Sequence, residues 1–321
     1  MKKSVCVFAS IIALLLVVCL SGCGSSKGSW NNTGGSVSTY TIYALACDST
    51  HGLVYAGTNY YGVWKYDGKT WTNSGGDISK YGIYSLACDS KNNLTYAGTA
   101  GHGVWKYDGK TWTDTGGAVS KYDIRALALD SKNNVLYAGT YLKGSSVNGV
   151  WKYDGTSWTT VGGESDKGIR ALALDSTNNV LYAGTYFFGV WKCDGTTWTD
   201  TGGRMSGHTI PCLAWDSKDN VLYAGPEGQG VGGNGVWKYD GTTWTDTGGG
   251  VSEHSPYSLA WDSTNNLLYA GVLIHGVWKY DGTTWTDTGG GASSYTVNAL
   301  ALDSTNNLLY AGTDAHGVWS K

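Results

Sequence analysis

The chain has 321 residues, a formal net charge of −3 at neutral pH, and an unusual composition with 49 glycines and 16 tryptophans. The glycines have no three-residue period, which excludes collagen, and the 41% hydrophobic and 13% aromatic content argues against intrinsic disorder. A nucleic-acid-binding protein is disfavoured, because the net charge is negative and Arg125, Arg170 and Arg204 are the only arginines.

The start of the chain predicts a secretory signal peptide over residues 1–22. Two lysines follow Met1, and an apolar run then extends from Val5 to Leu20, too short for a comfortable membrane span. The segment that ends at Cys23 has the sequence Leu-Ser-Gly-Cys, which resembles the lipobox of bacterial lipoproteins.

This resemblance implies that the signal is cleaved before Cys23 and that a lipid is attached to the Cys23 thiol. Residues 23–29 are then the lipidated cysteine and a flexible tether rich in glycine and serine. Acyl chains would anchor the protein to a membrane without spanning it. We therefore expect a lipoprotein of the bacterial cell envelope that faces the periplasm or the exterior. The alternative is a plain signal peptide with a chance cysteine.

Internal repetition organises residues 30–321. An Asp-Ser pair recurs, with its aspartates at Asp48, Asp89, Asp130, Asp175, Asp216, Asp262 and Asp303. A Gly-Val-Trp segment recurs with Trp64, Trp105, Trp151, Trp191, Trp237, Trp278 and Trp319. A second tryptophan series opens segments that end in Gly-Gly, at Trp30, Trp71, Trp112, Trp158, Trp198, Trp244 and Trp285. Seven similar units of about 42 residues indicate a repeat architecture.

Each unit predicts four short antiparallel strands. In one unit the expected strands are Ile124–Asp130, Val135–Thr140, Gly149–Asp154 and Ser157–Gly163, and Asp154-Gly155 is a hairpin signal. No segment has a sustained apolar period of 3.6 residues, so almost no helix is expected. Four strands per unit in seven units predict an all-β, seven-bladed β-propeller.

The two ends of the repeat region predict how the ring closes. Trp30–Gly35 is a fourth strand with no preceding first three, and Gly317–Trp319 is a third strand with no fourth after it. Pairing these two strands completes the last blade and removes its exposed edge. The propeller is therefore expected to span residues 30–321.

The repeat consensus ALALDSxNNxLYAGTxxxGVWKYDGTTWT resembles the repeats of bacterial two-component-regulator propellers, which are extracellular sensor modules. It also resembles the repeats of sortilin-type and sialidase-type propellers. The sialidase Asp-box has the form Ser-x-Asp-x-Gly-x-Thr-Trp, whereas Tyr239–Trp244 has its Asp and Gly adjacent, so this turn is one residue shorter. The resemblance implies a propeller fold and is compatible with many activities.

Most acidic residues recur in every repeat, which indicates a turn-capping role rather than catalysis. This holds for the Asp48 series and for Asp67, Asp108, Asp154, Asp194, Asp240 and Asp281. No nucleophile elbow, zinc motif or phosphate-binding loop is present, so neither an enzyme nor a bound cofactor is expected. Four cysteines outside the signal have no zinc spacing and are expected to be small core residues: Cys47, Cys88, Cys193 and Cys212.

The differences between repeats point to one face of the ring. The turns after the first and third strands are nearly constant, whereas the loops before the first strand and after the second strand vary. Because successive strands alternate in direction, both variable loops lie on the same face. Variable loops on a rigid scaffold are where binding usually resides.

Two series of residues on this face are candidates for a ligand-binding site. The first, in the loop before the first strand, is aromatic or histidine at Tyr40, Tyr81, Tyr122, His208, His254 and Tyr295. The second, expected at the mouth of the central channel, is Tyr43, Tyr84, Arg125, Arg170, Pro211, Tyr257 and Asn298. Aromatic faces and guanidinium groups together suit a sugar or an anion. The alternative is that the aromatic side chains pack between blades while the charged ones are solvated. The histidines of this face come from different blades, and no metal site is predicted.

The sequence thus predicts a surface-anchored, non-enzymatic binding module whose ligand is a glycan, a peptide or another envelope protein. One alternative is a structural scaffold of a membrane-associated complex. Another, disfavoured by the missing motifs, is a glycan-active enzyme of the sialidase or glycosidase type.

Overall fold

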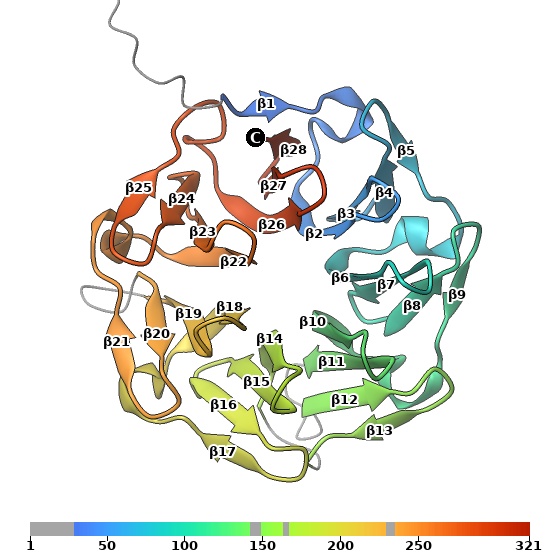
Figure 1. Cartoon of the computed structure of the whole chain (residues 1–321). Helices are drawn as coiled ribbons and strands as arrows, with labels where there is room; N and C mark the ends of the chain where they lie inside the picture. Colours follow the sequence, from blue (N-terminus) through green and yellow to red (C-terminus); the bar gives the residue numbers. More distant parts are fainter. Residues whose placement is uncertain (1–28, 142–148, 163–166, 229–234) are drawn as a thin grey trace, which may run out of the picture.

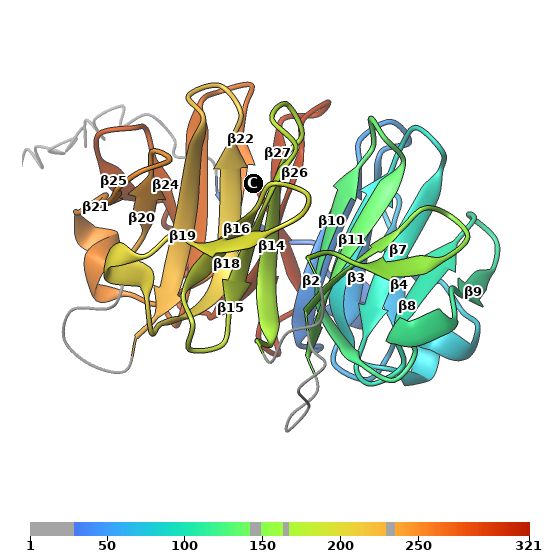
Figure 2. The same cartoon turned by 90° about the horizontal axis from the view of Figure 1, so that it is seen from below.

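A computed structural model describes residues 29–141, 149–162, 167–228 and 235–321. They form seven four-stranded antiparallel sheets arranged around a central axis, which confirms the predicted seven-bladed β-propeller (Figure 1). Seen edge-on, the innermost strands run along the axis of the ring (Figure 2). The predicted signal peptide, Cys23 and most of the tether lie outside the described residues.

The blades follow one another along the chain. Blade one has β2 (Ile42–Asp48), β3 (Leu53–Thr58), β4 (Val63–Tyr66) and β5 (Trp71–Asn73). Blade two has β6 (Ile83–Asp89), β7 (Leu94–Thr99), β8 (Val104–Tyr107) and β9 (Trp112–Asp114). Blade three has β10 (Asp123–Asp130), β11 (Val135–Tyr141), β12 (Gly149–Tyr153) and β13 (Trp158–Thr160). Blade four has β14 (Ile169–Asp175), β15 (Val180–Thr185), β16 (Val190–Cys193) and β17 (Trp198–Asp200).

The remaining blades repeat this order. Blade five has β18 (Thr209–Asp216), β19 (Val221–Glu227), β20 (Trp237–Tyr239) and β21 (Trp244–Asp246). Blade six has β22 (Pro256–Asp262), β23 (Leu267–Val272), β24 (Val277–Tyr280) and β25 (Trp285–Asp287). Blade seven has β26 (Val297–Asp303), β27 (Leu308–Thr313), β28 (Val318–Ser320) and, from the other end of the chain, β1 (Asn31–Asn32).

Helical structure is limited to short 3-10 turns in the part of the chain that is described, as the absence of helical periodicity predicts. These turns are η1 (Gly35–Val37), η2 (Asp77–Lys80), η3 (Gly117–Val119), η4 (Gly203–Met205) and η5 (Gly250–Glu253). The outermost strands are shorter than expected, because the glycine that follows them turns the backbone into the left-handed region, as at Gly116 with φ of 65°. None of the helices in the described ranges is long and apolar enough to cross a membrane.

The ring closes as the sequence predicts. β1 pairs antiparallel with β28, with Asn31 opposite Ser320 and Asn32 opposite Trp319. The backbone N–H of Thr33 extends the pairing by donating to the carbonyl of Val318 at 2.9 Å. Residues from the two ends of the chain therefore complete one sheet, in which β1 covers the outer edge of β28.

Two repeated contacts join each blade to the next. Around the outside, the indole Nε1 of the outermost-strand tryptophan donates to an oxygen just after the outermost strand of the preceding blade, for Trp71, Trp112, Trp158, Trp198, Trp244, Trp285 and Trp30. Nearer the axis, the glycine of the second strand lies against a buried aliphatic residue of the next blade. A Cβ on Gly57 would lie 2.6 Å from Cγ2 of Ile83, so the close approach of blades one and two requires glycine there.

The repeated aspartates cap turns, as expected. Oδ1 of Asp130 accepts hydrogen bonds from the backbone N–H groups of Lys132 and Asn133, both at 3.1 Å. Oδ1 of Asp154 accepts the corresponding bonds from Thr156 and Ser157, both at 2.8 Å. These turns lie on the constant face of the ring.

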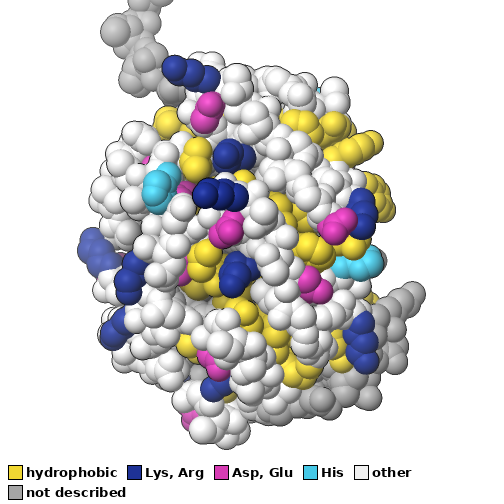
Figure 3. Space-filling view, turned by 90° about the vertical axis from the view of Figure 1, so that its right-hand side faces the viewer, with side chains coloured by type: hydrophobic (Ala, Val, Ile, Leu, Met, Phe, Trp, Pro, Cys, Tyr) yellow, Lys and Arg dark blue, Asp and Glu magenta, His cyan; other side chains and the backbone are white. Residues whose placement is uncertain are grey.

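The four cysteines expected to be small core residues are free thiols. Cys193 and Cys212 are buried, and burial raises the pKa of the Cys88 and Cys212 thiols to about 12. On the outer surface, Lys and Arg side chains are interspersed with Asp and Glu, and no large field of one sign is visible (Figure 3).

Candidate functional site

The seven residues predicted at the channel mouth line one cavity of about 270 Å³. We call this set the mouth ring; its members are Tyr43, Tyr84, Arg125, Arg170, Pro211, Tyr257 and Asn298. Each comes from the innermost strand of a different blade. In every blade the register between the first two strands shifts at this residue, as between Ile124 and Ala126 around Arg125. A β-bulge changes the direction of a side chain from the regular alternation of a strand between the two faces of its sheet. In this protein a bulge occurs at each of the seven residues of the mouth ring.

Below the mouth ring the channel becomes apolar. Its walls there are formed by one leucine from each blade, Leu45, Leu86, Leu127, Leu172, Leu213, Leu259 and Leu300. Small residues, such as Ala44 and Ser85, fill the positions between these leucines and the mouth ring. A ligand at the mouth would therefore meet polar groups first and, deeper in the channel, the leucine side chains.

Arg125 is held by a carboxylate and an aromatic ring. Its Nη2 donates to Oδ2 of Asp123 at 3.2 Å, and its guanidinium lies 4.2 Å from the centre of the Tyr84 ring. The side chain is 27% exposed. Nε of Arg125 is buried and has no hydrogen-bond partner among the residues that the structure describes. A buried donor of this kind costs free energy unless a water or a ligand accepts from it.

Arg170 occupies the equivalent place in the next blade. Its Nη1 donates to the hydroxyl of Tyr186 at 3.0 Å and lies 3.8 Å from Oε2 of Glu227, and the side chain is 19% exposed. Tyr186 in turn stacks on Tyr141, with 4.6 Å between ring centroids. The two arginines are thus paired with carboxylates and packed on aromatic rings. The expectation of solvated charges is wrong for them, and they do not form an uncompensated anion site.

The tyrosines of the mouth ring are neutral hydrogen-bonding groups at physiological pH. Burial raises the pKa of Tyr43, Tyr84 and Tyr257 above the ordinary phenol value. The rings of Tyr43 and Tyr84 are 5.8 Å apart and inclined by 51°. They present adjacent aromatic surfaces next to Arg125, and Tyr257 lines another side of the same cavity.

The first predicted series does not line this cavity. Its rings pack on the loop between the second and third strands of their own blades: Tyr40 on Tyr61 at 4.4 Å, Tyr81 on His102 at 4.0 Å, His254 on His275 at 4.1 Å and Tyr295 on His316 at 3.9 Å. Tyr122 is buried, with 3% exposure. The backbone carbonyls of all six, His208 included, accept from a glycine N–H of the preceding blade. Packing therefore accounts for this series without a ligand, although the rings pack within their own blades and not between blades as the alternative interpretation expected.

The basic residues near this series also pack on aromatic rings. Lys80 lies over Tyr81, Lys167 over Trp191 and Arg204 over Trp237. His102 and His316 stack on tyrosines and His254 stacks on His275, and burial lowers the pKa of His254. Within the described ranges, no group of three His, Cys, Asp or Glu side chains is placed to hold a metal ion.

Sequence reasoning missed a further series around the mouth. The residue at or just after the end of each second strand reads Asn59, Ala100, Tyr141, Tyr186, Glu227, Leu273 and Asp314. Tyr186 and Glu227 contact Arg170, and the Arg125 guanidinium lies 5.7 Å from the centre of the Tyr141 ring. Oδ1 of Asp314 accepts a hydrogen bond from the Thr41 hydroxyl at 2.8 Å. Aligning the repeats at the Tyr-Ala-Gly segment would have shown this variable position. Its proximity to the mouth ring depends on how β-strands pair across the bulge.

No protein-family model and no curated protein sequence matches the chain. Among solved structures it is similar to the extracellular domain of BT4673 from B. thetaiotaomicron, described as a one-component or hybrid two-component system, with TM-score 0.71 and 19% identity over 91% of this chain and 39% of that one. It is also similar to the GH74 xyloglucanase from Xanthomonas campestris, with TM-score 0.73 and 17% identity over 91% of this chain and 53% of that one. The Niastella koreensis GH74 enzyme gives TM-score 0.69 and 18% identity over 91% of this chain and 53% of that one.

The chain thus spans 39% to 53% of the length of these proteins. At this level of identity the likeness shows the propeller fold alone, because propellers with the same architecture serve as sensors and as enzymes.

Proposed function

We propose that this chain is a non-enzymatic binding module of the bacterial cell envelope and that its ligand binds at the mouth ring. The observation that carries the proposal is that every blade contributes one side chain to a single cavity, with a bulge at that position. Residues that only hold the ring together are nearly identical in every blade, as the outer tryptophans are. The mouth ring instead combines tyrosine, arginine, proline and asparagine.

The chemistry of the mouth ring favours a small polar group as the part of the ligand that enters. The cavity of about 270 Å³ is at the lower end of the size of ligand pockets. Tyr43 and Tyr84 provide faces for the C–H surface of a sugar or for an aromatic side chain. Arg125 and Asn298 provide hydrogen-bond donors, with Nε of Arg125 still lacking an acceptor in the described residues. A glycan end or a peptide segment meets these demands.

The likeness to the BT4673 extracellular domain supports a sensing or binding role outside the cytoplasm. We place the protein on a bacterial membrane through acyl chains on Cys23. Metabolic labelling with a fatty-acid probe tests this: the wild-type chain is expected to be labelled, and Cys23→Ser is expected to lose the label. Labelling that persists in Cys23→Ser would overturn the lipid anchor.

A glycan array combined with a pulldown from envelope extract tests the binding role. The probe is the soluble Cys23→Ser protein, alone and with Arg125→Ala or Arg170→Ala added. Arg204→Ala is the matched control, because it removes the same side chain away from the mouth cavity. Ligand retention that is lost in the first two variants and kept in the control is the expected result. Retention that is equal in all variants would contradict a site at the mouth ring.

The same assay separates the two alternatives. Release of a shortened product from a retained glycan would favour a glycan-active enzyme, the role to which the GH74 likeness points. Co-purification of envelope proteins that is insensitive to Arg125→Ala and Arg170→Ala would favour a scaffold.

A further inference from the structure

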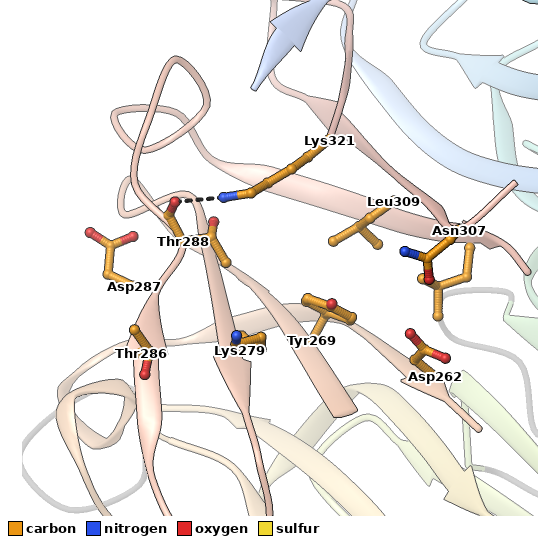
Figure 4. A pocket seen from close by; sticks show the side chains of 10 residues that line it. Asp262, Tyr269, Lys279, Thr286, Asp287, Thr288, Asn307, Leu309 and Lys321 are labelled. Atoms are coloured by element: carbon orange, nitrogen blue, oxygen red, sulfur yellow. Dashed lines mark hydrogen bonds between the residues drawn. The ribbon is translucent and has the colours of Figure 1, made fainter. Parts of the chain in front are cut away.

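A second cavity, of about 320 Å³, lies between blades six and seven and shares no residue with the mouth ring. Its walls come from β23, β24 and β25 of blade six and from β26, β27 and the end of the chain in blade seven (Figure 4). The side chains that matter below are Tyr269, Leu302, Leu309, Lys279 and Lys321. We call this cavity the seam cavity.

The equivalent space between other blades contains a tyrosine. The third strand carries a tyrosine near its end at Tyr66, Tyr107, Tyr153, Tyr239 and Tyr280. Each of these rings stacks on the outermost-strand tryptophan of its own blade, with 4.9 Å between centroids. Two of them also meet a tyrosine of the preceding blade edge-on: Tyr107 meets Tyr55 at 6.3 Å, and Tyr280 meets Tyr223 at 6.4 Å. A phenol ring therefore fills the gap between adjacent blades.

Blade seven has Lys321 at this repeat position. The Lys321 side chain runs along the cavity wall, and its Nζ donates to the carbonyl of Thr288 at 2.8 Å (Figure 4). Tyr269 stands where Tyr55 and Tyr223 stand, and no aromatic ring is recorded against it among the described residues. Blade four also lacks the tyrosine, but its Cys193 is fully buried and packs in one cluster with Leu181 and Trp198.

The rest of the seam keeps the geometry of the other junctions. Nε1 of Trp30 donates to Oγ1 of Thr288 at 2.9 Å, as Nε1 of Trp285 donates to Oγ1 of Thr247 at 2.9 Å. The outer tryptophan is thus in its usual place while the tyrosine that would stack on it is missing. The cavity lies beside the repeat position at which Lys321 replaces the tyrosine.

We propose that the seam cavity is a binding site for a phenol ring. The template is the repeat itself, because five of the other six blades place a tyrosine ring at the matching position. Tyr269 offers an edge-on aromatic partner, and Leu302 and Leu309 offer aliphatic contacts. Lys279 and Asp287 provide polar groups at the rim for a hydroxyl or a further substituent. The phenol could belong to a free phenolic compound or to a tyrosine side chain of a peptide.

The test measures binding by saturation-transfer NMR and titration calorimetry with two probes, p-cresol and N-acetyl-L-tyrosinamide. Binding of both is expected if a tyrosine side chain enters, and binding of p-cresol alone is expected if the natural ligand is a free phenol. Toluene, which lacks the hydroxyl, is expected to bind more weakly. Absence of binding for both phenol probes would overturn the proposal.

Lys321→Tyr restores the residue of the other repeats and is the decisive variant. It is expected to fill the cavity, weaken p-cresol binding by about tenfold or more and raise the melting temperature. Lys69→Tyr, in an exposed turn, is the matched control and is expected to bind as the wild type does. Lys321→Ala also removes the lysine but leaves the cavity open, so it should retain p-cresol binding. Loss of binding in Lys321→Tyr alone is then due to the added ring and not to the loss of the lysine. Binding that survives Lys321→Tyr in a folded protein would overturn the proposal.

Discussion

Nε1 of Trp30 donates a hydrogen bond of 2.9 Å to Oγ1 of Thr288, across 258 residues of sequence. The same bond joins the other blades over 37 to 43 residues. The two ends of the chain are therefore joined by the contact that every other pair of blades makes, with the β1–β28 pairing beside it.

Removing this closure is expected to destabilise the whole ring. A chain that begins at Ser36 loses β1 and the buried Trp30 side chain, and deleting a large buried aromatic group alone costs about 3–5 kcal/mol. A chain that begins at Trp30 is the control and should melt at the temperature of the longer protein. Thermal denaturation followed by near-UV circular dichroism measures the difference. Equal melting temperatures for the two chains would contradict closure by β1.

Asp123 and Arg125 are expected to depend on each other. Their side chains are only 26% and 27% exposed, so Asp123→Ala leaves a partly buried guanidinium without its carboxylate. We expect Asp123→Ala to destabilise the protein by about 1–2 kcal/mol, and the Asp123→Ala, Arg125→Ala double variant to lose less than the sum of the two single variants. Urea unfolding of the wild type, the two single variants and the double variant gives the coupling free energy between Asp123 and Arg125. Strict additivity would show that the 3.2 Å pair contributes nothing.

The core thiols are expected to be unreactive in the folded protein. Burial raises the pKa of Cys88 and Cys212 to about 12, so these thiols are protonated at pH 8 and the reactive thiolate is scarce. A chain that begins at Trp30 retains Cys47, Cys88, Cys193 and Cys212 as its cysteines. Ellman's reagent at pH 8 should titrate these thiols only after denaturant is added. Rapid reaction of the native protein would mean that the blades open far more often than the buried interfaces imply.

The hairpin aspartates predict a loss of stability in acid. Backbone and hydroxyl donors of Ser157 and Thr156 hold the pKa of Asp154 well below its usual range, and Asp240 and Asp281 are held in the same way. A carboxyl whose folded pKa is depressed stabilises the fold above its unfolded pKa of about 4, and this stabilisation is lost as the pH falls towards the folded value.

Urea unfolding between pH 7 and pH 2 should therefore show stability falling below about pH 4. Asp154→Asn is expected to flatten this dependence, because the amide no longer titrates. Asp219→Asn is the control, because Asp219 lies in the turn between β18 and β19 that Asp216 caps and is not itself the capping residue. If Asp154→Asn leaves the pH dependence of the free energy of unfolding unchanged, the hairpin aspartates are not the cause of the loss of stability in acid.

One variable loop stores backbone strain. Ile274 has φ of 63°, a left-handed conformation that costs a β-branched residue about 1–3 kcal/mol, and its side chain is 59% exposed. The equivalent residue of blade two is Gly101 with φ of 72°. Ile274→Gly is therefore expected to stabilise the protein by about 1 kcal/mol in urea unfolding. Leu273→Gly, one residue earlier and not in the left-handed region, should not stabilise it; a gain in both variants would rule out relief of strain at residue 274.

The sequence alone predicted the number of blades, the four strands of each and the closure by the first strand, because every one of these depends on spacing that repeats. Asp67 and Asp154 occur at the same point of each unit, so a local capping role could be read without knowing how the blades pack. The mouth ring was also accessible, since the residue that differs at one aligned position of each repeat must lie at one level of the ring.

Only the tertiary structure decided what these residues contact. Tyr186 reaches Arg170 because the pairing of β15 with β14 places the end of the second strand beside the bulge of the first, and Glu227 reaches the same arginine from the neighbouring blade. The same holds for Tyr40 and His254, whose rings look like binding groups in the sequence but are covered by neighbouring loops. The seam cavity depends on one substitution, Lys321 for tyrosine, and a space left by a missing ring becomes visible only once the neighbouring blades surround it.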